Sequence, residues 1–170
     1  MKVRSKVGDD STSSRIISTP IGKLTLVASP RGLQRVIFGA RKLSQTKRAR
    51  TKTCGHLTQA ERQLREYFAG ERKKFSIKLD IGGTEFQESA WLALKRIGYG
   101  KTISYAQQAR LVGKPKACRA VGSANGKNPV AIVLPCHRVI ASGGTLGGYG
   151  GGLAIKRKLI ALEKDFSAAG

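Results

Sequence analysis

Residues 104–126 read SYAQQARLVGKPKACRAVGSANG and indicate the architecture of the second half of the chain. Ser104 and Gln107 form a capping box, in which a hydroxyl and a side-chain amide satisfy free backbone groups at the start of a helix. Thr84 and Gln87 form another, which opens a preceding helix that ends at Gly98. Gly113 ends the helix that begins after Ser104, and Pro115 marks a turn before a second short helix. Two short helices joined by a glycine-containing turn are typical of a helix-turn-helix, although many small helical domains contain such corners.

The second helix is built almost entirely from small residues, with Arg119 as the one long side chain among Ala117, Cys118, Ala120, Gly122, Ser123 and Ala124. A surface of small residues lets a helix approach another backbone closely. The pattern alone leaves two interpretations open: tight packing between helices, or close approach to a ligand with the arginine standing out as a wedge.

The adjacent pair Cys136 and His137 is the candidate reactive site. Residues 130–134 predict a short buried strand, and Pro135 removes a backbone donor, so Cys136 is expected where that strand turns. A lone cysteine is commonly a core residue, but His137 is the only histidine in the C-terminal half. Neighbours in an extended chain point to opposite sides, so we hypothesise that a water carries the thiol proton to His137.

Glu163 is the one carboxylate that this site could readily recruit. Between Glu88 and Glu163 lie 74 residues with 12 lysines or arginines and no acid. Glu163 is therefore expected to hold the second ring nitrogen of His137 and to stabilise the imidazolium, as in hydrolase triads. The surrounding positive charge is expected to favour the Cys136 thiolate, because a free thiol has a pKa of about 8.5.

A glycine-rich loop follows the site, with seven glycines in residues 143–152 around Leu146 and Tyr149. The loop lacks the spacing of a phosphate-binding loop. It is expected either to form a lid or wall where backbone comes close to a flat ligand, or to be simply flexible.

The N-terminal half predicts a small mixed α/β unit. Antiparallel strands joined by tight turns are expected from residue 15 to about residue 43, and a capping box at Thr58 opens a helix that stops at Gly70. Residues 75–81 alternate as in a half-buried strand, and a Gly-Gly pair at 82–83 gives a natural boundary. Outside these elements, residues 1–14 are expected to form a disordered tail and residues 41–52 an exposed basic loop.

Composition excludes some functions and favours others. The 170 residues carry a net charge of +22, which favours a polyanionic partner but fits a solvated basic surface or a ribosome-type RNA binder equally well. The longest apolar run has five residues, so a membrane role is excluded, and the N-terminus lacks a signal-peptide core. Three cysteines without a C-x-x-C pair indicate reduced thiols, and we expect a cytoplasmic protein.

Several motifs in a fixed order resemble the O6-alkylguanine-DNA alkyltransferases: ISY at 103–105, RAVG at 119–122, NP at 128–129, PCHRV at 135–139, GY at 148–149 and LE at 162–163. The specific similarity covers residues 86–163. The N-terminal half resembles the family more loosely, through PIG at 20–22 and YFAG at 67–70.

This resemblance implies an α/β (α+β) fold with two domains. A small ribonuclease-H-like α/β domain is expected over residues 15–82, and a mainly helical winged helix-turn-helix domain over residues 83–166, followed by a tail at 167–170. The implied activity moves an alkyl group from guanine O6 in double-stranded DNA, and also from O4-alkylthymine, onto Cys136. The transfer happens once per molecule and needs neither cofactor nor metal. The implied protein is a monomer in solution that could cluster on DNA.

The resemblance also implies roles for individual residues. The helix-turn-helix would approach the minor groove, with Ser104 among the contacts and with Ala117, Cys118 and Ala120 letting the backbone lie close to the sugars. Arg119 matches the arginine finger that fills the gap left by a flipped nucleotide.

In the implied pocket, Tyr105 would donate its hydroxyl proton to guanine N3, and Asn128 would tie the active-site turn to the helix-turn-helix. The backbone carbonyls of Cys136 and Val139 would accept the guanine amine, and Tyr149 and Gly150 would line the wall.

Three features depart from the family pattern. Gly150 lacks the hydroxyl that some members carry, Cys118 is an extra thiol beside the arginine finger, and Cys54 with His56 gives no zinc ligand set.

Three alternative functions are open. An alkyltransferase-like lesion sensor would lack the cysteine after Pro135, and a cysteine hydrolase usually has its Cys and His distant in sequence. A plain nucleic-acid binder would not explain the Cys-His-Glu set.

Overall fold

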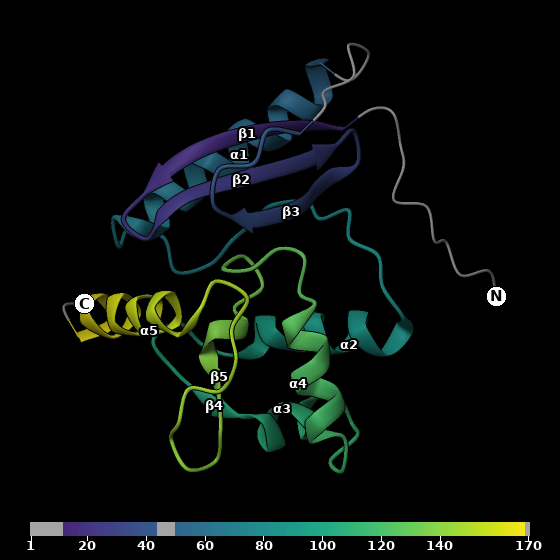
Figure 1. Cartoon of the computed structure of the whole chain (residues 1–170), viewed down its shortest axis with the longest axis vertical. Helices are drawn as coiled ribbons and strands as arrows, with labels where there is room; N and C mark the ends of the chain where they lie inside the picture. The colour runs from purple at the N-terminus through teal and green to yellow at the C-terminus, as the bar shows by residue number, and fades with distance from the viewer. Residues whose placement is uncertain (1–11, 44–49, 169–170) are drawn as a thin grey trace. The chain divides into compact units, whose positions relative to one another are not determined.

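The computed structural model describes residues 12–43 and 50–168 (Figure 1). The chain divides into two compact units, Met1–Gly82 and Gly83–Gly170. Within the described residues the first unit has a small sheet and one long helix, whereas the second is mostly helical. The expected mixed α/β fold, with a small N-terminal sheet domain and a helical C-terminal domain, is confirmed.

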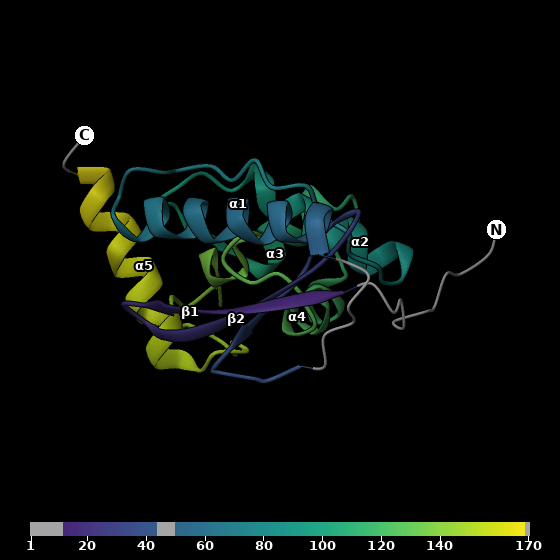
Figure 2. The ribbon, with the colours of Figure 1, turned by 90° about the horizontal axis from the view of Figure 1, so that it is seen from above.

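The first unit contains a three-stranded antiparallel sheet in the order β1 (Ser13–Thr19), β2 (Gly22–Ser29), β3 (Gly32–Phe38). Alternation along β2 places Leu24 and Leu26 on one face, where both are fully buried. Helix α1 (Arg50–Phe68) covers this face (Figure 2). The predicted antiparallel strands and tight turns are therefore confirmed.

Helix α1 begins earlier than the capping box at Thr58 predicts. Thr58 lies inside the helix, and its hydroxyl accepts a hydrogen bond from Arg15 at 3.3 Å instead of capping a helix start. The reason is that the buried stripe continues upstream, with Thr53 and Leu57 buried at the same helical spacing as Ala60 and Leu64. The predicted helix was thus two turns too short.

Residues 75–81 do not form the predicted strand. They make a single parallel bridge, in which Leu33 N donates to Lys78 O at 2.8 Å and Asp80 N donates to Leu33 O at 2.9 Å. The backbone N–H of Ser76 instead donates to the side chain of Gln63 on α1, at 2.9 Å. A helix side chain therefore takes the place that a neighbouring strand would fill.

The predicted tails and loop extend too far into ordered elements. Ser13 begins β1, so the expected tail of residues 1–14 is wrong beyond residue 12, and residues 1–11 lie outside the described part. Residues 50–52 of the expected basic loop belong to α1, and residues 44–49 lie outside the described part. Residues 167–168 of the expected C-terminal tail belong to helix α5 (Leu153–Ala168).

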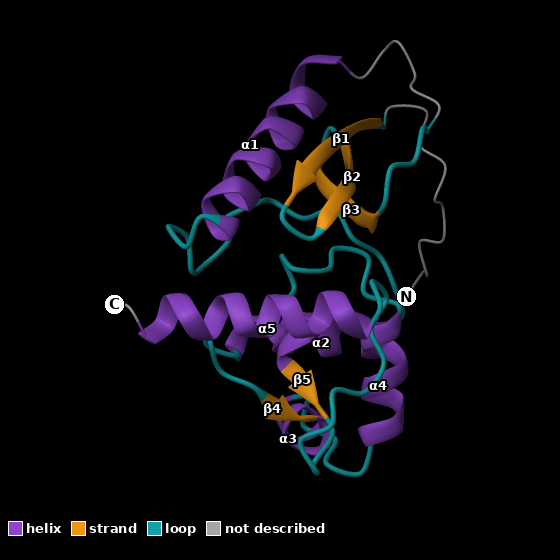
Figure 3. Cartoon of the chain, turned by 60° about the vertical axis from the view of Figure 1, so that its left-hand side comes forward, coloured by secondary structure: helices purple, strands orange, loops and turns teal. Residues whose placement is uncertain are grey.

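The second unit places four helices around two short strands (Figure 3). Capping boxes open α2 (Glu85–Ala93) and α3 (Tyr105–Leu111), as predicted. The other elements are η2 (Leu94–Arg96), α4 (Cys118–Gly126), η3 (Cys136–Arg138), α5 (Leu153–Ala168), and the parallel pair β4 (Ile103–Ser104) and β5 (Val139–Ile140).

Buried polar side chains fix α3 and α4 against α2. Trp91 Nε1 donates to the Ala124 carbonyl at 2.7 Å. The Gln108 and Asn125 amides bond each other twice, at 2.7 and 3.1 Å, and Gln108 also donates to the Ala90 carbonyl at 3.0 Å. Because each buried amide is satisfied, the two helices of the helix-turn-helix are held in one arrangement.

Across the described ranges, 12–43 and 50–168, no helix is both long and apolar enough to cross a membrane. The expected cytoplasmic location stays a prediction.

Candidate active site around Cys136

The segment before Cys136 is buried, but it is a tight turn and not the predicted strand. Residues 130–134 are all buried, Leu134 N donates to Val130 O at 3.0 Å, and Ile132 has a φ of 75°. The side chain of Asn128 closes this turn, accepting from Val130 N at 3.1 Å and donating to Leu134 O at 2.8 Å. One amide side chain thus satisfies the backbone groups that a neighbouring strand would otherwise bond.

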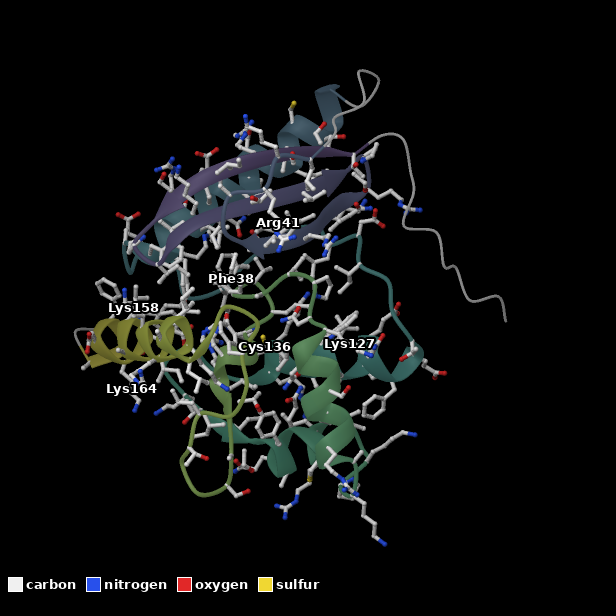
Figure 4. All side chains as sticks on the ribbon, in the orientation of Figure 1. Phe38, Arg41, Lys127, Cys136, Lys158 and Lys164 are labelled. Atoms are coloured by element: carbon white, nitrogen blue, oxygen red, sulfur yellow. The ribbon has the colours of Figure 1, made fainter. Side chains whose placement is uncertain are left out.

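Cys136, labelled in Figure 4, is the first residue of η3. Only 7% of its surface is exposed. Asn128 Nδ2 lies 3.2 Å from Sγ. Burial raises the pKa of the Cys136 thiol, while the Asn128 hydrogen bond and the charge of Lys156 act in the opposite direction without outweighing it. The positive charge of Lys156 thus favours the thiolate, as expected, but desolvation outweighs it and the net pKa is raised.

His137 is completely buried and bonds Glu163, with 2.8 Å between Nε2 and Oε1. An ionised carboxylate only accepts hydrogen bonds, so Nε2 must carry the proton and Nδ1 must present a lone pair. Nδ1 has no hydrogen-bond partner among the described residues, and no hydrogen bond joins His137 to Cys136 there. Burial lowers the pKa of His137, which leaves the ring neutral at neutral pH.

Glu163 is shared between His137 and Arg138. Burial alone would raise its pKa, but the hydrogen bonds and charges of His137 and Arg138 lower that pKa to about 2. Arg138 bonds both carboxylate oxygens, at 2.8 and 3.0 Å, and donates to the Ile97 carbonyl at 2.6 Å. Since His137 is neutral, the permanently charged Arg138 is the partner that keeps Glu163 ionised.

Lys156 is a buried cation that the sequence reasoning missed. Its Nζ donates to the carbonyl of Val139, at 2.7 Å, and to the carbonyl of Leu146 in the glycine-rich loop. Burial lowers the pKa of Lys156, and a Cys136 thiolate would raise it. The signal was present, because Lys156 and Glu163 stand seven residues apart on α5 and therefore lie on one helical face.

Tyr105 and the glycine-rich loop lie against each other. Tyr105 is the first residue of α3 and is partly buried, and burial, with the charge of a Cys136 thiolate, raises its pKa. Gly147 has a φ of 62°, and a Cβ there would come within 2.8 Å of the Tyr105 hydroxyl oxygen. Only glycine fits this approach, so this part of the loop is a wall packed on Tyr105.

Comparison with known proteins identifies the family. Residues 14–81 match the profile described as "6-O-methylguanine DNA methyltransferase, ribonuclease-like domain", and residues 85–165 match "6-O-methylguanine DNA methyltransferase, DNA binding domain". The chain belongs to the 6-O-methylguanine DNA methyltransferase family. The resemblance noted from the sequence motifs is confirmed.

Similar proteins cover nearly the full length of this family member. The "Methylated-DNA--protein-cysteine methyltransferase" of Mycobacterium tuberculosis (strain ATCC 25618 / H37Rv) is 47% identical over 159 residues, 91% of this chain and 94% of that protein. The protein of the same name from Methanosarcina acetivorans is 47% identical over 150 residues, 87% of this chain and 96% of that protein. A crystal structure of Mycobacterium tuberculosis OGT in complex with DNA has a TM-score of 0.77 and 47% identity, and covers 90% of this chain and 93% of that one.

The remaining residues singled out from the sequence fall into two groups in this 6-O-methylguanine DNA methyltransferase family member. Tyr149 lies near His137, with 6.5 Å between the two ring centroids in an edge-on arrangement, whereas Gly150 is exposed. The second group is on or beside the helix-turn-helix: Ser104 caps α3, Arg119 and Ala120 are exposed on α4, and Ala117 and Cys118 are half-buried. No described hydrogen bond connects this second group to Cys136.

Metal ligands are not gathered anywhere in the described residues, where no group of three or more His, Cys, Asp or Glu side chains could hold an ion. Cys54 is exposed on α1 and Cys118 is half-buried at the start of α4.

Proposed function

We propose that this protein repairs DNA by transferring an alkyl group from guanine O6 to Sγ of Cys136. The observation that carries the proposal is the buried set formed by Cys136, His137 and Glu163, with Asn128 on the sulfur. The chain also has the cysteine after Pro135 that a lesion sensor would lack. Family membership and close similarity to proteins named methylated-DNA–protein-cysteine methyltransferases support the same conclusion.

The first step is removal of the thiol proton. Because burial raises the pKa of Cys136, a base is needed, and the lone pair on His137 Nδ1 is the base we propose. A water bridging Sγ and Nδ1 would carry the proton, since no direct hydrogen bond joins the two side chains among the described residues. The imidazolium that forms is stabilised by Glu163, which stays ionised down to a pH of about 2.

In the second step the sulfur lone pair forms the S–C bond while the electrons of the C–O6 bond pass to guanine. Negative charge then develops on the leaving base, so a proton donor lowers the barrier. Tyr105 is the proposed donor, to guanine N3, and its raised pKa keeps the hydroxyl protonated. The Tyr105 phenolate then recovers a proton from the His137 imidazolium through water. The net reaction therefore moves the alkyl group from oxygen to sulfur and a proton from sulfur to guanine.

The pocket is proposed to close around the flipped base with the backbone carbonyls of Cys136 and Val139, together with Tyr149 and Gly150. The Val139 carbonyl is already fixed by Lys156 at 2.7 Å, so its direction is set before the base arrives. We extend the proposal to O4-alkylthymine, whose exocyclic oxygen carries its alkyl group in the same way. The thioether product is stable, so each molecule is expected to react once, as a monomer.

DNA binding is proposed to use α4 in the minor groove. Its small residues permit a close approach, and the exposed side chain of Arg119 would occupy the place of the flipped nucleotide. Replacing Arg119 by Ala should slow repair of duplex DNA far more than reaction with free O6-benzylguanine, which needs no flipping. Equal losses in the two assays would contradict this role.

Intact-mass spectrometry tests the main proposal. After incubation with a duplex containing O6-methylguanine, the protein should gain about 14 Da, one methyl group in place of one hydrogen. Cys136→Ala should gain nothing while still binding DNA, and the matched control Cys54→Ala, which changes an exposed thiol on α1, should gain the full mass. A gain that survives in Cys136→Ala would refute the proposal. DNA binding without any gain in the wild type would indicate a lesion-binding protein.

A further inference from the structure

Positive charge is concentrated in the unit that lacks the helix-turn-helix. Residues 1–82 hold 19 of the 32 lysines and arginines and six of the ten acids. The proposed contact through α4 does not involve this unit. The excess of cations there consequently needs a separate explanation.

Two cations lie on the sheet face opposite α1. Arg15 on β1 is paired in register with Leu26 and bonds Glu61 on α1 at 2.8 Å, so the Leu26 side of the sheet faces the helix. Lys23 and Val27 alternate with Leu26 along β2 and therefore point to the other face. Arg35 is paired with Val27 and shares that face. Both Lys23 and Arg35 are exposed.

The segment after β3 adds two more cations to this face. Thr25 lies on the same side as Lys23, and its hydroxyl accepts from Arg41 N at 2.9 Å and donates to the Gly39 carbonyl at 2.8 Å. The segment therefore folds back over the face opposite α1, as Figure 2 shows, and Figure 4 labels Arg41 there. Arg41 and Lys42 are exposed. We name Lys23, Arg35, Arg41 and Lys42 the basic face.

The four described acids of this unit do not neutralise the basic face. Glu61 and Glu66 belong to α1 and bond arginines near that helix, and Asp80 is held by Arg31 at 3.0 Å. Glu71 follows α1. Among the described residues, no ion pair involves a member of the basic face. Four exposed cations therefore stand together without a counter-charge from the acids in residues 12–43 and 50–82.

The chemistry of this surface fits a phosphate backbone. Duplex DNA presents one negative charge per about 1.7 Å of axis, and arginine binds phosphate in a bidentate manner. A protein partner or a membrane would favour an apolar centre. Only two large apolar residues are exposed in the described part of this unit, Ile16, which is paired with Thr25 and so shares this face, and Leu43, which follows Lys42. Two such side chains among four cations do not make an apolar centre.

We propose that the basic face is a second, sequence-independent contact for the phosphates of DNA, separate from α4. This inference rests on the proposed function only in so far as the polyanion is DNA. It assigns to the N-terminal unit a share of the affinity for undamaged duplex.

The test is the salt dependence of binding to an undamaged duplex of about 30 base pairs, because each phosphate contact contributes about −0.9 to the slope of log K against log salt. A variant with all four basic-face residues replaced by Ser should flatten the slope by about 2 to 4 and weaken binding at least about tenfold at 0.1 M salt. The single changes Arg35→Ser and Arg41→Ser should each flatten it by about 0.9. These single variants keep the test valid if the fourfold variant fails to fold in a thermal unfolding check.

A matched control removes the same number of charges elsewhere in the unit. The variant Arg62→Ser, Arg65→Ser, Lys73→Ser, Lys74→Ser changes exposed cations on and after α1, and its slope should stay near that of the wild type. Equal flattening in both fourfold variants would show a bulk charge effect and overturn the inference. A wild-type slope in the basic-face variants would overturn the inference too. So would basic-face variants that no longer bind phosphatidylserine vesicles but bind the duplex as tightly as the wild type does.

The mass gain of the wild type distinguishes this inference from the proposed function. A protein that gains mass from damaged duplex but keeps its slope in the basic-face variants refutes only the second contact. A flattened salt slope in those variants, together with no mass gain in the wild type, would refute only the alkyl transfer.

Discussion

The two units treat charged side chains in opposite ways. In the N-terminal unit the ion pairs lie at the surface, as with Arg15 and Glu61, whose side chains are 34% and 23% exposed. In the C-terminal unit His137, Arg138, Lys156 and Glu163 are all buried. Burying charge is expensive unless each group is paired and hydrogen-bonded. The difference teaches that the second unit gives up stability to hold charged groups around one sulfur, whereas the first does not.

The strongest way to break this contrast is Glu163→Gln. The change leaves Arg138 buried without an anion, so the free energy of unfolding should fall by about 3–5 kcal/mol. Reaction of Cys136 with free O6-benzylguanine should also become much slower, because the imidazolium of His137 loses its partner. Urea denaturation and a single-turnover rate measure the two effects. A variant that stays as stable as the wild type would show that the buried pair is not needed for folding.

Acid should destabilise the protein through the same carboxylate. The pKa of Glu163 is lowered from 4.5 to about 2 on folding, so its stabilising contribution is full above pH 4.5 and is lost as the pH falls toward 2. The lowered pKa of His137 acts in the same direction below its usual 6.5. Unfolding free energy measured from pH 7 to pH 2.5 should decline in the wild type, and the decline below pH 4.5 should be smaller in Glu163→Gln. Parallel pH curves would contradict the assignment.

Lys156→Met sharpens the contrast, because it replaces a buried cationic side chain by an uncharged one of similar length. The carbonyls of Val139 and Leu146 would lose their donor, which should lower the unfolding free energy by about 1–3 kcal/mol. The pKa of Cys136 should rise further, because the charge of Lys156 opposes the effect of burial. The pH profile of iodoacetamide alkylation should therefore move to higher pH. If Lys156 had only a structural role, Lys156→Met would lower the stability and leave the pH profile of alkylation unchanged.

Gly147→Ala should have a smaller effect on stability, about 1–2 kcal/mol, because it combines a left-handed backbone with a clash on the Tyr105 ring. Gly148→Ala is the matched control, since a Cβ there has nothing within 4 Å. Thermal unfolding compares the two variants. Equal losses would mean that contact with Tyr105 does not constrain the loop.

The smallest effect is expected in the N-terminal unit. Glu61→Gln breaks surface pairs with Arg15 and Arg65, and such pairs contribute less than about 1 kcal/mol. Urea denaturation at low and at high salt should give nearly the same small difference from the wild type. A loss as large as that of Glu163→Gln would remove the contrast between the units.

The sequence was sufficient where local chemistry decides the structure. The capping boxes at Thr84 and Ser104 formed as predicted, because a hydroxyl three residues before an amide side chain needs no tertiary partner. The hydrogen bond between His137 and Glu163 was predictable for another reason: with acids so scarce, a buried imidazole had one available carboxylate.

Prediction failed where a side chain replaced a backbone partner. Gln63 takes the N–H of Ser76, and Asn128 takes the backbone groups on both sides of the turn at 130–134, so neither segment forms a strand. Arg138 was missed for another reason, because one cation in a chain with 32 of them gives no sign that it will be buried. For Lys156 the only signal was its seven-residue spacing from Glu163 on α5. The raised pKa of Cys136 was not predicted, since net charge is visible in a sequence and desolvation is not.

One residue beside the nucleophile has a conformation that side chains of its type avoid. Ile132 has a φ of 75°, where a branched residue is disfavoured by about 1–2 kcal/mol, although its side chain is wholly enclosed. Glycine would relax the backbone but leave a hole in the packing, and an extended backbone would carry the cysteine elsewhere. Substitutions at Ile132 are therefore expected to yield few variants with a higher melting temperature that also leave the Cys136 sulfur in place.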